Sequence, residues 1–257
     1  MRYFVLTLLL ALCVLRGVYS LSAQDVDKIA ERIWKNECAG ALEGLTHWNK
    51  GENFASLGIG HFIWYAEGQR ERFEETFPAL LEFLQKRGAV LPAWLKTVSS
   101  CPWHSRDAFY ADAHSPKMKS LRQFLFDTKS LQALFMVHRL ESALPAFLSI
   151  CPSQEKEKIS ALFHRLSKDS RGVYALIDYV NFKGKGTASE ETYKGKGWGL
   201  LQVLQQMPSS SKDPVADFVE AAKALLRQRV LNSPPERHEE KWLKGWFNRL
   251  DTYYSNQ

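Results

Sequence analysis

The stretch from Asn36 to Tyr65 constrains this chain most, because acids, turn residues and aromatic residues gather there directly after an amphipathic helix. In that helix, apolar residues recur with the spacing of a face buried along one side. They are Val26, Ile29, Ala30, Ile33 and Trp34. The Ala39-Gly40 step predicts the end of the helix, because glycine readily takes positive φ. The sequence therefore predicts a helix that runs straight into a turn-rich segment.

Glu37 lies one turn after Ile33 and extends the apolar face of this predicted helix. We therefore expect its carboxyl group to point toward the protein interior. Burial disfavours the charged carboxylate and so raises the pKa of the carboxyl group. A general acid that works near neutral pH requires such a raised pKa, because it must still carry its proton. An exposed glutamate at a helix end is the alternative, since Glu is mostly found on protein surfaces.

A β-hairpin is expected after Gly44, where two short extended runs flank an Asn/Gly cluster. The runs cover residues 45–48 and 54–61. Gly58 and Gly60 in the second run predict a strand end at which the backbone passes close to other groups.

The segment Ser56-Leu-Gly-Ile-Gly-His61, preceded by a helix-end glutamate and a turn-rich hairpin, resembles the phage-type lysozymes of the lysozyme-like superfamily. Those enzymes carry a catalytic Glu after the first helix, an Asp in the hairpin, and a Thr just before a Gly-x-Gly-His segment. The resemblance places Ser56 at the Thr position, where it keeps the hydroxyl and lacks one methyl group. It places His61 at the position of a histidine that forms a structural ion pair in the family.

The resemblance leaves two choices among the carboxylates. The Asp position falls on Lys50, and Glu52 is the nearest carboxylate, so we take Glu52 as the candidate second acid and Ser56 as the group that positions a water. A solvated turn residue and a backbone-bonded hydroxyl are the alternatives for these two. Glu43-Gly-Leu imitates the family's Glu-Gly-Leu, whereas Glu37-Cys-Ala-Gly has the helix-end position and resembles related transglycosylases. We prefer Glu37 as the acid.

Helical patterns with proline and capping residues at their starts cover most of the remaining chain, and strand signals there are weak. Between Gln69 and Arg87, Pro78 interrupts such a pattern, which predicts two helices or a kink. We predict an α+β, mainly α fold, a lysozyme-like helical domain with a small β-hairpin lobe. No internal repeat or long linker divides residues 21–257, so one domain is expected. Residues 67–165 have no counterpart in the phage enzymes and are expected to be a helical insertion.

The C-terminal third follows the order of the corresponding lysozyme helices in segments 175–182, 200–206 and 231–237. From this region we assign Asn181, Tyr193 and Trp198 to substrate binding, together with His61 from the hairpin. Aromatic rings combine an apolar face with polar edges, as sugar binding requires. Core packing is the alternative for both aromatic residues.

Residues 1–20 have the pattern of a secretory signal peptide, with a basic start, an apolar run and a small residue at the end. The run is too short to span a bilayer. Cleavage is expected after Ser20 or Ala23. We therefore expect an exported protein, periplasmic or secreted, without stable membrane insertion after cleavage.

Removal of residues 1–20 lowers the Lys and Arg count from 34 to 32 against 28 acidic residues, a net charge of +4. This excess favours anionic surfaces such as cell-wall polymers. A Gly/Lys-rich loop holds four of the cations, either at a cleft for an acidic glycan or in a solvated loop. They are Lys183, Lys185, Lys194 and Lys196. The basic residues form no stripe with stacking aromatic residues, so no nucleic-acid partner is expected.

Metal and thiol chemistry find little support in the sequence. The seven histidines lack ligand spacing, and His238-Glu-Glu lacks the second histidine of a zinc protease, so neither a metal nor a cofactor is expected. Cys38, Cys101 and Cys151 remain after signal removal. A disulfide between Cys101 and Cys151, each followed by proline, and three reduced buried thiols are both open.

These features predict a glycoside hydrolase that cleaves β-1,4 bonds of peptidoglycan, or of a chitin-type amino-sugar polymer, by carboxylic general acid catalysis. A lytic transglycosylase, in which one Glu acts as acid and base, is the alternative enzyme. A catalytically inactive glycan-binding envelope protein with the same body is the alternative from another class.

Overall fold

The computed structural model describes residues 21–71, 73–188, 192–210 and 212–254. The predicted signal peptide, residues 1–20, lies outside the described residues. The described chain is mainly helical with a small antiparallel sheet, which confirms the predicted α+β, mainly α class.

The α-helices, in chain order, are α1 (Ala23–Cys38), α2 (Phe77–Lys86), α3 (Arg106–Ala111), α4 (Pro116–Asp127), α5 (Lys129–Glu141), α6 (Ala143–Ile150), α7 (Ser153–Leu166), α8 (Ser170–Lys183), α9 (Leu200–Gln206), α10 (Pro214–Asn232) and α11 (Glu240–Asp251). One sheet consists of β1 (Thr46–His47), β2 (Phe54–Leu57) and β3 (Phe62–Tyr65), and a second of β4 (Thr192–Tyr193) and β5 (Lys196–Gly197).

Helix α1 forms as its sequence pattern predicts. Ser22 and Asp25 form a capping box at its start, which typically contributes about 1 kcal/mol. Val26, Ile29 and Ile33 are buried, and each such side chain contributes roughly 1.5–3 kcal/mol on burial. At the other end Ala39 has a left-handed φ of 52° and Gly40 follows with 66°, so the helix ends at the predicted step.

The predicted hairpin is part of a three-stranded sheet with the order β1-β2-β3. His47 faces Ser56 across the first antiparallel pair, and Ser56 faces Ile63 across the second. The second extended run is shorter than expected, because the chain turns after Leu57 and returns as β3. Gly58 has a φ of 72°, and a Cβ there would lie 2.4 Å from the amide oxygen of Gln132, so the predicted close approach is confirmed.

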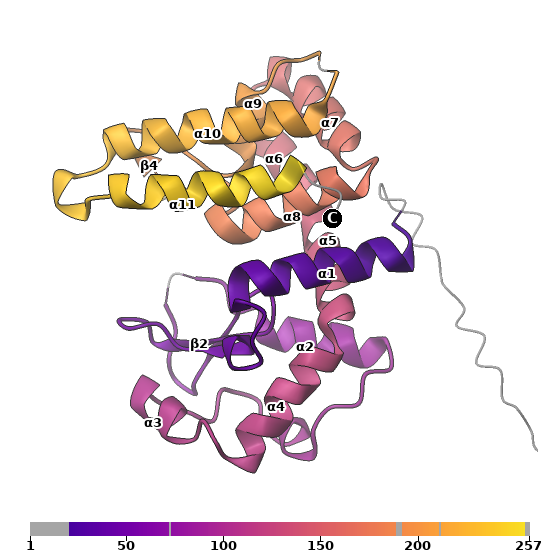
Figure 1. The fold of residues 1–257 in the computed structure, drawn as a ribbon, viewed down its shortest axis with the longest axis vertical. Helices are drawn as coiled ribbons and strands as arrows, with labels where there is room; N and C mark the ends of the chain where they lie inside the picture. The colour runs from indigo at the N-terminus through magenta and orange to yellow at the C-terminus, as the bar shows by residue number, and fades with distance from the viewer. Residues whose placement is uncertain (1–20, 72, 189–191, 211, 255–257) are drawn as a thin grey trace, which may run out of the picture.

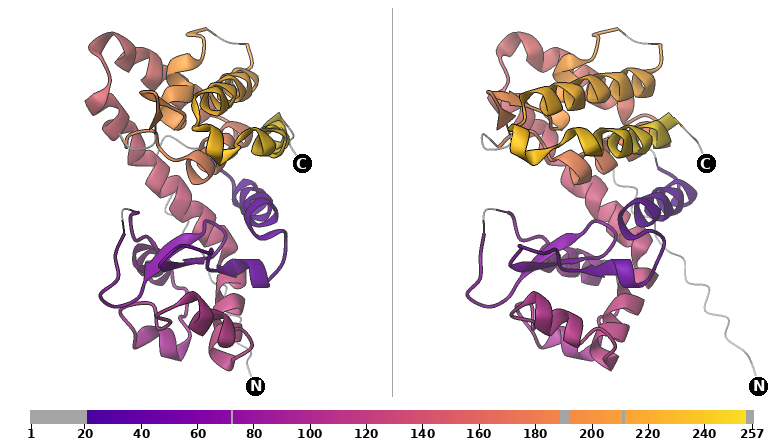
Figure 2. Two further views of the ribbon diagram at one scale, coloured as in Figure 1. Left: turned by 90° about the vertical axis from the view of Figure 1, so that its left-hand side faces the viewer. Right: turned by 60° about the vertical axis from the view of Figure 1, so that its left-hand side comes forward.

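The chain has two lobes. Figures 1 and 2 show the sheet β1–β3 with α2, α3 and α4 at one end and the helices α7–α11 at the other, with α1 and α5 lying between them. Helix α5 packs against α1, α2 and α8. The central helix α5 therefore lies within residues 67–165. The segment Lys129–Ile150 is long and apolar enough to cross a membrane by length and composition, and core helices share that composition.

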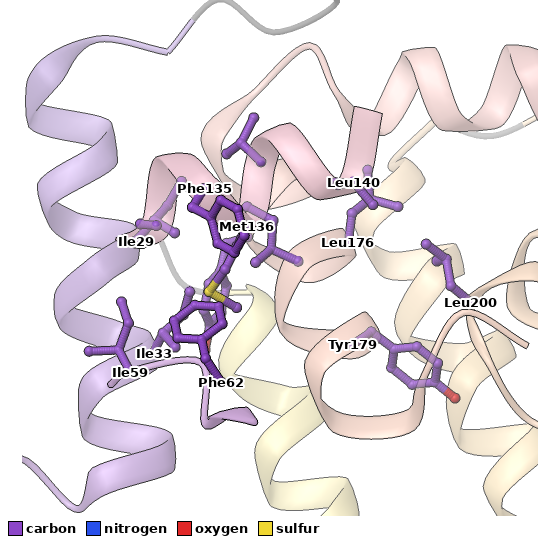
Figure 3. Close-up of a cluster of buried hydrophobic side chains, with 14 of the residues drawn as sticks. Ile29, Ile33, Ile59, Phe62, Phe135, Met136, Leu140, Leu176, Tyr179 and Leu200 are labelled. Atoms are coloured by element: carbon purple, nitrogen blue, oxygen red, sulfur yellow. The ribbon is translucent and has the colours of Figure 1, made fainter. Parts of the chain in front are cut away.

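The core is continuous between the lobes. Figure 3 shows buried side chains from α1, α5, α8 and the turn before β3 packed together. The labelled residues include Ile33, Phe62, Phe135, Leu140 and Leu176.

The structure differs from the prediction for residues 69–87. A helix begins only at Phe77, with Pro78 in its first turn, where proline is tolerated because the missing N–H has no helical partner. The preceding segment is irregular and hydrogen-bonds to β3 through Thr76. The three described cysteines are free and buried, so the Cys101–Cys151 disulfide is absent.

Candidate active site

A cleft of about 320 Å³ lies between the sheet lobe and helices α5 and α8. Its size falls within the range of small-molecule sites, roughly 300–1,000 Å³. Residues 60–63 of the turn and of β3 line the cleft, together with Phe73, Glu74 and Thr76. Met136, Arg139 and Leu140 of α5 and residues of α8 complete the lining. Glu37, from the end of α1, faces into this cleft.

Two other residues assigned from the sequence, Asn181 and His61, lie beside Glu37. Its side chain is 12% exposed. Asn181 of α8 donates from Nδ2 to Glu37 Oε1 at 3.0 Å. The His61 Nδ1 atom lies 3.7 Å from Glu37 Oε2. The end of α1, helix α8 and the turn before β3 thus bring an acid, an amide and an imidazole together in the lining of the cleft.

Arg249 of α11 is the main partner of Glu37, and sequence reasoning missed it. Its guanidinium donates to Glu37 Oε1, and to both oxygens of Asp178 at 2.8 and 2.9 Å. Burial lowers the pKa of Arg249, but the charges of Asp178 and Glu37 outweigh burial and raise it above its usual value. Arg249 is therefore a permanent cation between two carboxylates.

Asp178 is fully buried and holds this guanidinium in place. Besides the two bonds from Arg249, it accepts a hydrogen bond from the Tyr253 hydroxyl at 2.6 Å. A buried carboxylate needs such donors, because an unpaired buried charge is very costly. Of the two carboxylates that Arg249 binds, Glu37 lines the cleft and Asp178 does not, so Glu37 is the one that a ligand can contact.

His61 has an unusual backbone and an unusual environment. Its φ of 47° is left-handed, which is uncommon for residues other than glycine and concentrates at functional sites. Burial lowers its pKa, partly opposed by the charge of Glu37, while His47 and Arg249 lower it further. His47 stacks on it with ring centroids 6.2 Å apart. His61 is therefore neutral near pH 7, and its Nε2 atom is buried without a partner among the described residues.

Glu52 and Ser56 do not line the cleft with Glu37. Glu52 lies in the turn between β1 and β2 and accepts a hydrogen bond from Asn49 at 3.0 Å. Partial burial raises its pKa, and the bond from Asn49 opposes this rise. Ser56 is buried in the middle strand, because its register places it between His47 and Ile63. Glu43, the alternative acid, is exposed at the start of a short 3₁₀ helix outside the cleft lining.

Tyr193 and Trp198 also lie away from the cleft lining. Their rings contact each other at 4.7 Å between centroids, and the guanidinium of Arg229 lies 4.0 Å from the ring of Trp198. Tyr193 donates to the buried carboxylate of Glu239, which also binds Arg229 through two hydrogen bonds. Tyr193 and Trp198 therefore pack against this buried ion pair, which joins α10 to the start of α11.

The four lysines of the Gly/Lys-rich loop separate in the structure. Lys183 is buried, with its Nζ atom 3.5 Å from the ring centroid of Trp246, and burial lowers its pKa to about 6. Lys185 lines the cleft. Lys194 and Lys196 are exposed on the β4–β5 hairpin. Only Lys185 therefore has a position from which it can contact a ligand near Glu37.

Asp178 carried a signal that would have identified it from the sequence. It is an acid within the apolar face of a helix, and such an acid requires a buried donor. Arg249 carried no such signal, since it lies in a helix with many charges.

Within the described ranges, no group of three or more His, Cys, Asp and Glu side chains is arranged to hold a metal ion. The cleft lining contains carboxyl, amide, imidazole, guanidinium and ammonium groups. No protein-family model matches this chain, and no curated protein or solved structure matches it.

Proposed function

We propose that this protein is a glycoside hydrolase that cleaves β-1,4 bonds of peptidoglycan, with Glu37 as the general acid. One observation carries the proposal. A carboxyl group at the end of the first helix faces a cleft beside a small sheet and is held from behind by a buried Arg249–Asp178 pair. The order of helix, acid, sheet and helical body agrees with the resemblance to phage-type lysozymes, and a lysozyme-like body is part of the proposal.

The two oxygens of Glu37 have different partners, which suits an acid. Asn181 and Arg249 both donate to Oε1, whereas Oε2 faces His61 at 3.7 Å, beyond hydrogen-bond distance. A proton carried on Oε2 can pass to the glycosidic oxygen as its bond to the anomeric carbon breaks, while a water oxygen bonds to that carbon and releases a proton to the solvent, from which Oε2 is protonated again. The carboxylate left behind is then stabilised through Oε1 by groups already in place, which is how a preorganised site favours charge that develops during reaction.

A lytic transglycosylase is the second candidate, and the location of Glu52 favours it. Glu52 does not line the cleft. Besides Glu37, the described lining contains one further acid, Glu74, and its carboxylate is bound to Arg139 at 2.8 Å. In this reaction Glu37 protonates the leaving oxygen and then takes the proton from a hydroxyl of the same sugar. The oxygen of that hydroxyl bonds to the anomeric carbon, and the product closes into an anhydro ring without water or a second carboxylate.

The proposed substrate lies outside the cytoplasm, in agreement with the expected signal peptide. We therefore propose that the mature protein acts in the periplasm or after secretion. The net charge of +4 expected after removal of residues 1–20 favours approach to anionic wall polymers.

The test is incubation of purified mature protein with peptidoglycan, followed by mass analysis of the chain ends. New reducing ends identify a hydrolase, and anhydro ends identify a transglycosylase. Binding without cleavage identifies an inactive glycan-binding protein and overturns both enzyme proposals. A chitin-type oligosaccharide in a parallel reaction tests the alternative polymer.

Glu37→Gln is the decisive variant, and Glu43→Gln is its matched control. Loss of general acid catalysis typically lowers the rate about 10²- to 10⁴-fold, so Glu37→Gln should lose cleavage to that extent. Glu43 is exposed outside the cleft, so its variant should keep the wild-type rate. If the two variants exchange these behaviours, the acid is Glu43 and the assignment of Glu37 is wrong.

A further inference from the structure

The segment of residues 73–76 contributes Phe73, Glu74 and Thr76 to the lining of the cleft. Thr76 exchanges two hydrogen bonds with the backbone of Ile63, and Glu75 accepts one from the backbone N–H of Tyr65. The hydroxyl of Tyr65 donates to the carbonyl of Phe73 at 3.2 Å. These bonds tie the irregular segment to β3 and so place Phe73, Glu74 and Thr76 at the cleft.

Phe73 is an exposed aromatic residue within the cleft lining. It is 37% exposed, whereas Phe62, the other aromatic residue of the described lining, is 2% exposed. Its ring contacts Phe54 edge to face, with centroids 5.8 Å apart, and Phe54 packs in the same way on Tyr65. An accessible aromatic side chain in the lining of a cleft, beside a few polar groups, is the usual composition of a ligand site.

Next to this ring lies a polar pair that also lines the cleft. Arg139 of α5 donates to the carboxylate of Glu74 at 2.8 Å, and their side chains are 33% and 70% exposed. Exposed pairs of this kind add little to stability. Their remaining N–H groups and lone pairs are available for other hydrogen bonds.

We propose that Phe73 and the Glu74–Arg139 pair form a sugar-binding subsite for one pyranose ring of a glycan, separate from the group that breaks the bond. A pyranose has an apolar face of C–H groups and a rim of hydroxyls, which matches an aromatic ring beside a donor and an acceptor. A purely apolar ligand fits poorly, because it would desolvate the ion pair without replacing its hydrogen bonds. This inference rests on the proposed function, since it places the same glycan in the same cleft.

The subsite is tested by binding in the Glu37→Gln background, where turnover is removed. The probe is an oligosaccharide from the peptidoglycan glycan strand, titrated calorimetrically. Phe73→Ala should weaken binding about tenfold, from the loss of one aromatic contact and its buried area. Phe73→Trp should keep the affinity because it keeps a flat ring, and Phe73→Leu should weaken it because apolar bulk alone does not stack.

Trp242→Ala is the matched control, since Trp242 is an aromatic residue of α11 that is 54% exposed outside the cleft lining. Circular dichroism of each variant establishes folding, and Phe73→Leu provides a second variant should Phe73→Ala unfold. If the oligosaccharide binds the Glu37→Gln background and Phe73→Ala or Phe73→Leu binds equally well, the subsite is refuted and the proposed function stands. If neither wild type nor Glu37→Gln binds the oligosaccharide, the proposed function fails as well.

Discussion

Replacement of Arg249 by Met should be among the most destabilising single changes in this protein. Met keeps most of the length and apolar volume of the side chain but removes the cation. Arg249 donates to both oxygens of the fully buried Asp178 and to Glu37, so its loss leaves two carboxylates with no cationic partner. Removal of one member of a buried ion pair typically costs about 3–5 kcal/mol. For a chain of this size, that corresponds to a decrease of roughly 10 °C in the melting temperature.

The measurement is urea unfolding followed by circular dichroism, with Lys244→Met as the control. Lys244 lies on the same helix and is exposed, so its loss should change the free energy of unfolding by less than about 0.5 kcal/mol. The double variant Asp178→Asn, Arg249→Met removes one carboxylate together with the cation. Its loss of unfolding free energy should therefore be smaller than the sum of the losses of the two single variants, because the two residues interact.

Two results would refute this reasoning. One is a loss of less than about 1 kcal/mol for Arg249→Met, which would mean that the site is open enough for water to replace the guanidinium. The other is strict additivity of the two single variants, since additivity is the behaviour of residues that do not interact.

Three further predictions concern other buried polar groups. Burial would raise the pKa of Glu239, but hydrogen bonds from Arg229 and Tyr193 lower it to about 2. The ionised Glu239 therefore stabilises the fold above pH 4.5, and this stabilisation should be lost as the pH falls toward 2. Glu239→Gln should abolish this part of the acid dependence in unfolding measurements. Burial lowers the pKa of Lys183 from 10.5 to about 6. Between these two pH values the Lys183 amine binds a proton in the unfolded chain but not in the folded one, so the free energy of unfolding should rise with pH over that interval. Lys183→Met should raise the melting temperature at pH 7 and flatten that rise, and an unchanged slope would contradict the assignment. Gln132→Ala should cost about 1–3 kcal/mol, because the N–H of Ile59 loses its acceptor, and faster hydrogen exchange at Ile59 would identify the site.

Local patterns were sufficient to predict the first half of the candidate site. The apolar spacing of α1, its end at Ala39-Gly40 and the Asn/Gly turn all depend on residues close together in the chain. These features determine which side of the helix faces the core, and therefore that Glu37 points inward. The close approach at Gly58 was predictable for the same reason, because only glycine tolerates that backbone and that space.

The segment before α2 shows where local patterns were misleading. Apolar spacing around Phe73 favoured a helix, but bonds to β3 from Glu75 and Thr76 hold the segment in an irregular conformation. The extended partner strand satisfies the backbone of this segment better than a short helix before Pro78 would. Phe73 consequently reaches the cleft, which no helical pattern predicts.

The amino-acid sequence by itself determined a mainly helical chain, a small sheet after the first helix, and an inward-facing acid at their junction. Only the tertiary structure decided that Arg249, more than two hundred residues away, shares its charge between Glu37 and Asp178. It also decided that Glu52 and Ser56 lie outside the cleft lining and that Trp198 packs under Arg229. The physical reason is that spacing along a chain determines the direction of a side chain, whereas the partner of a buried charge depends on which elements pack together.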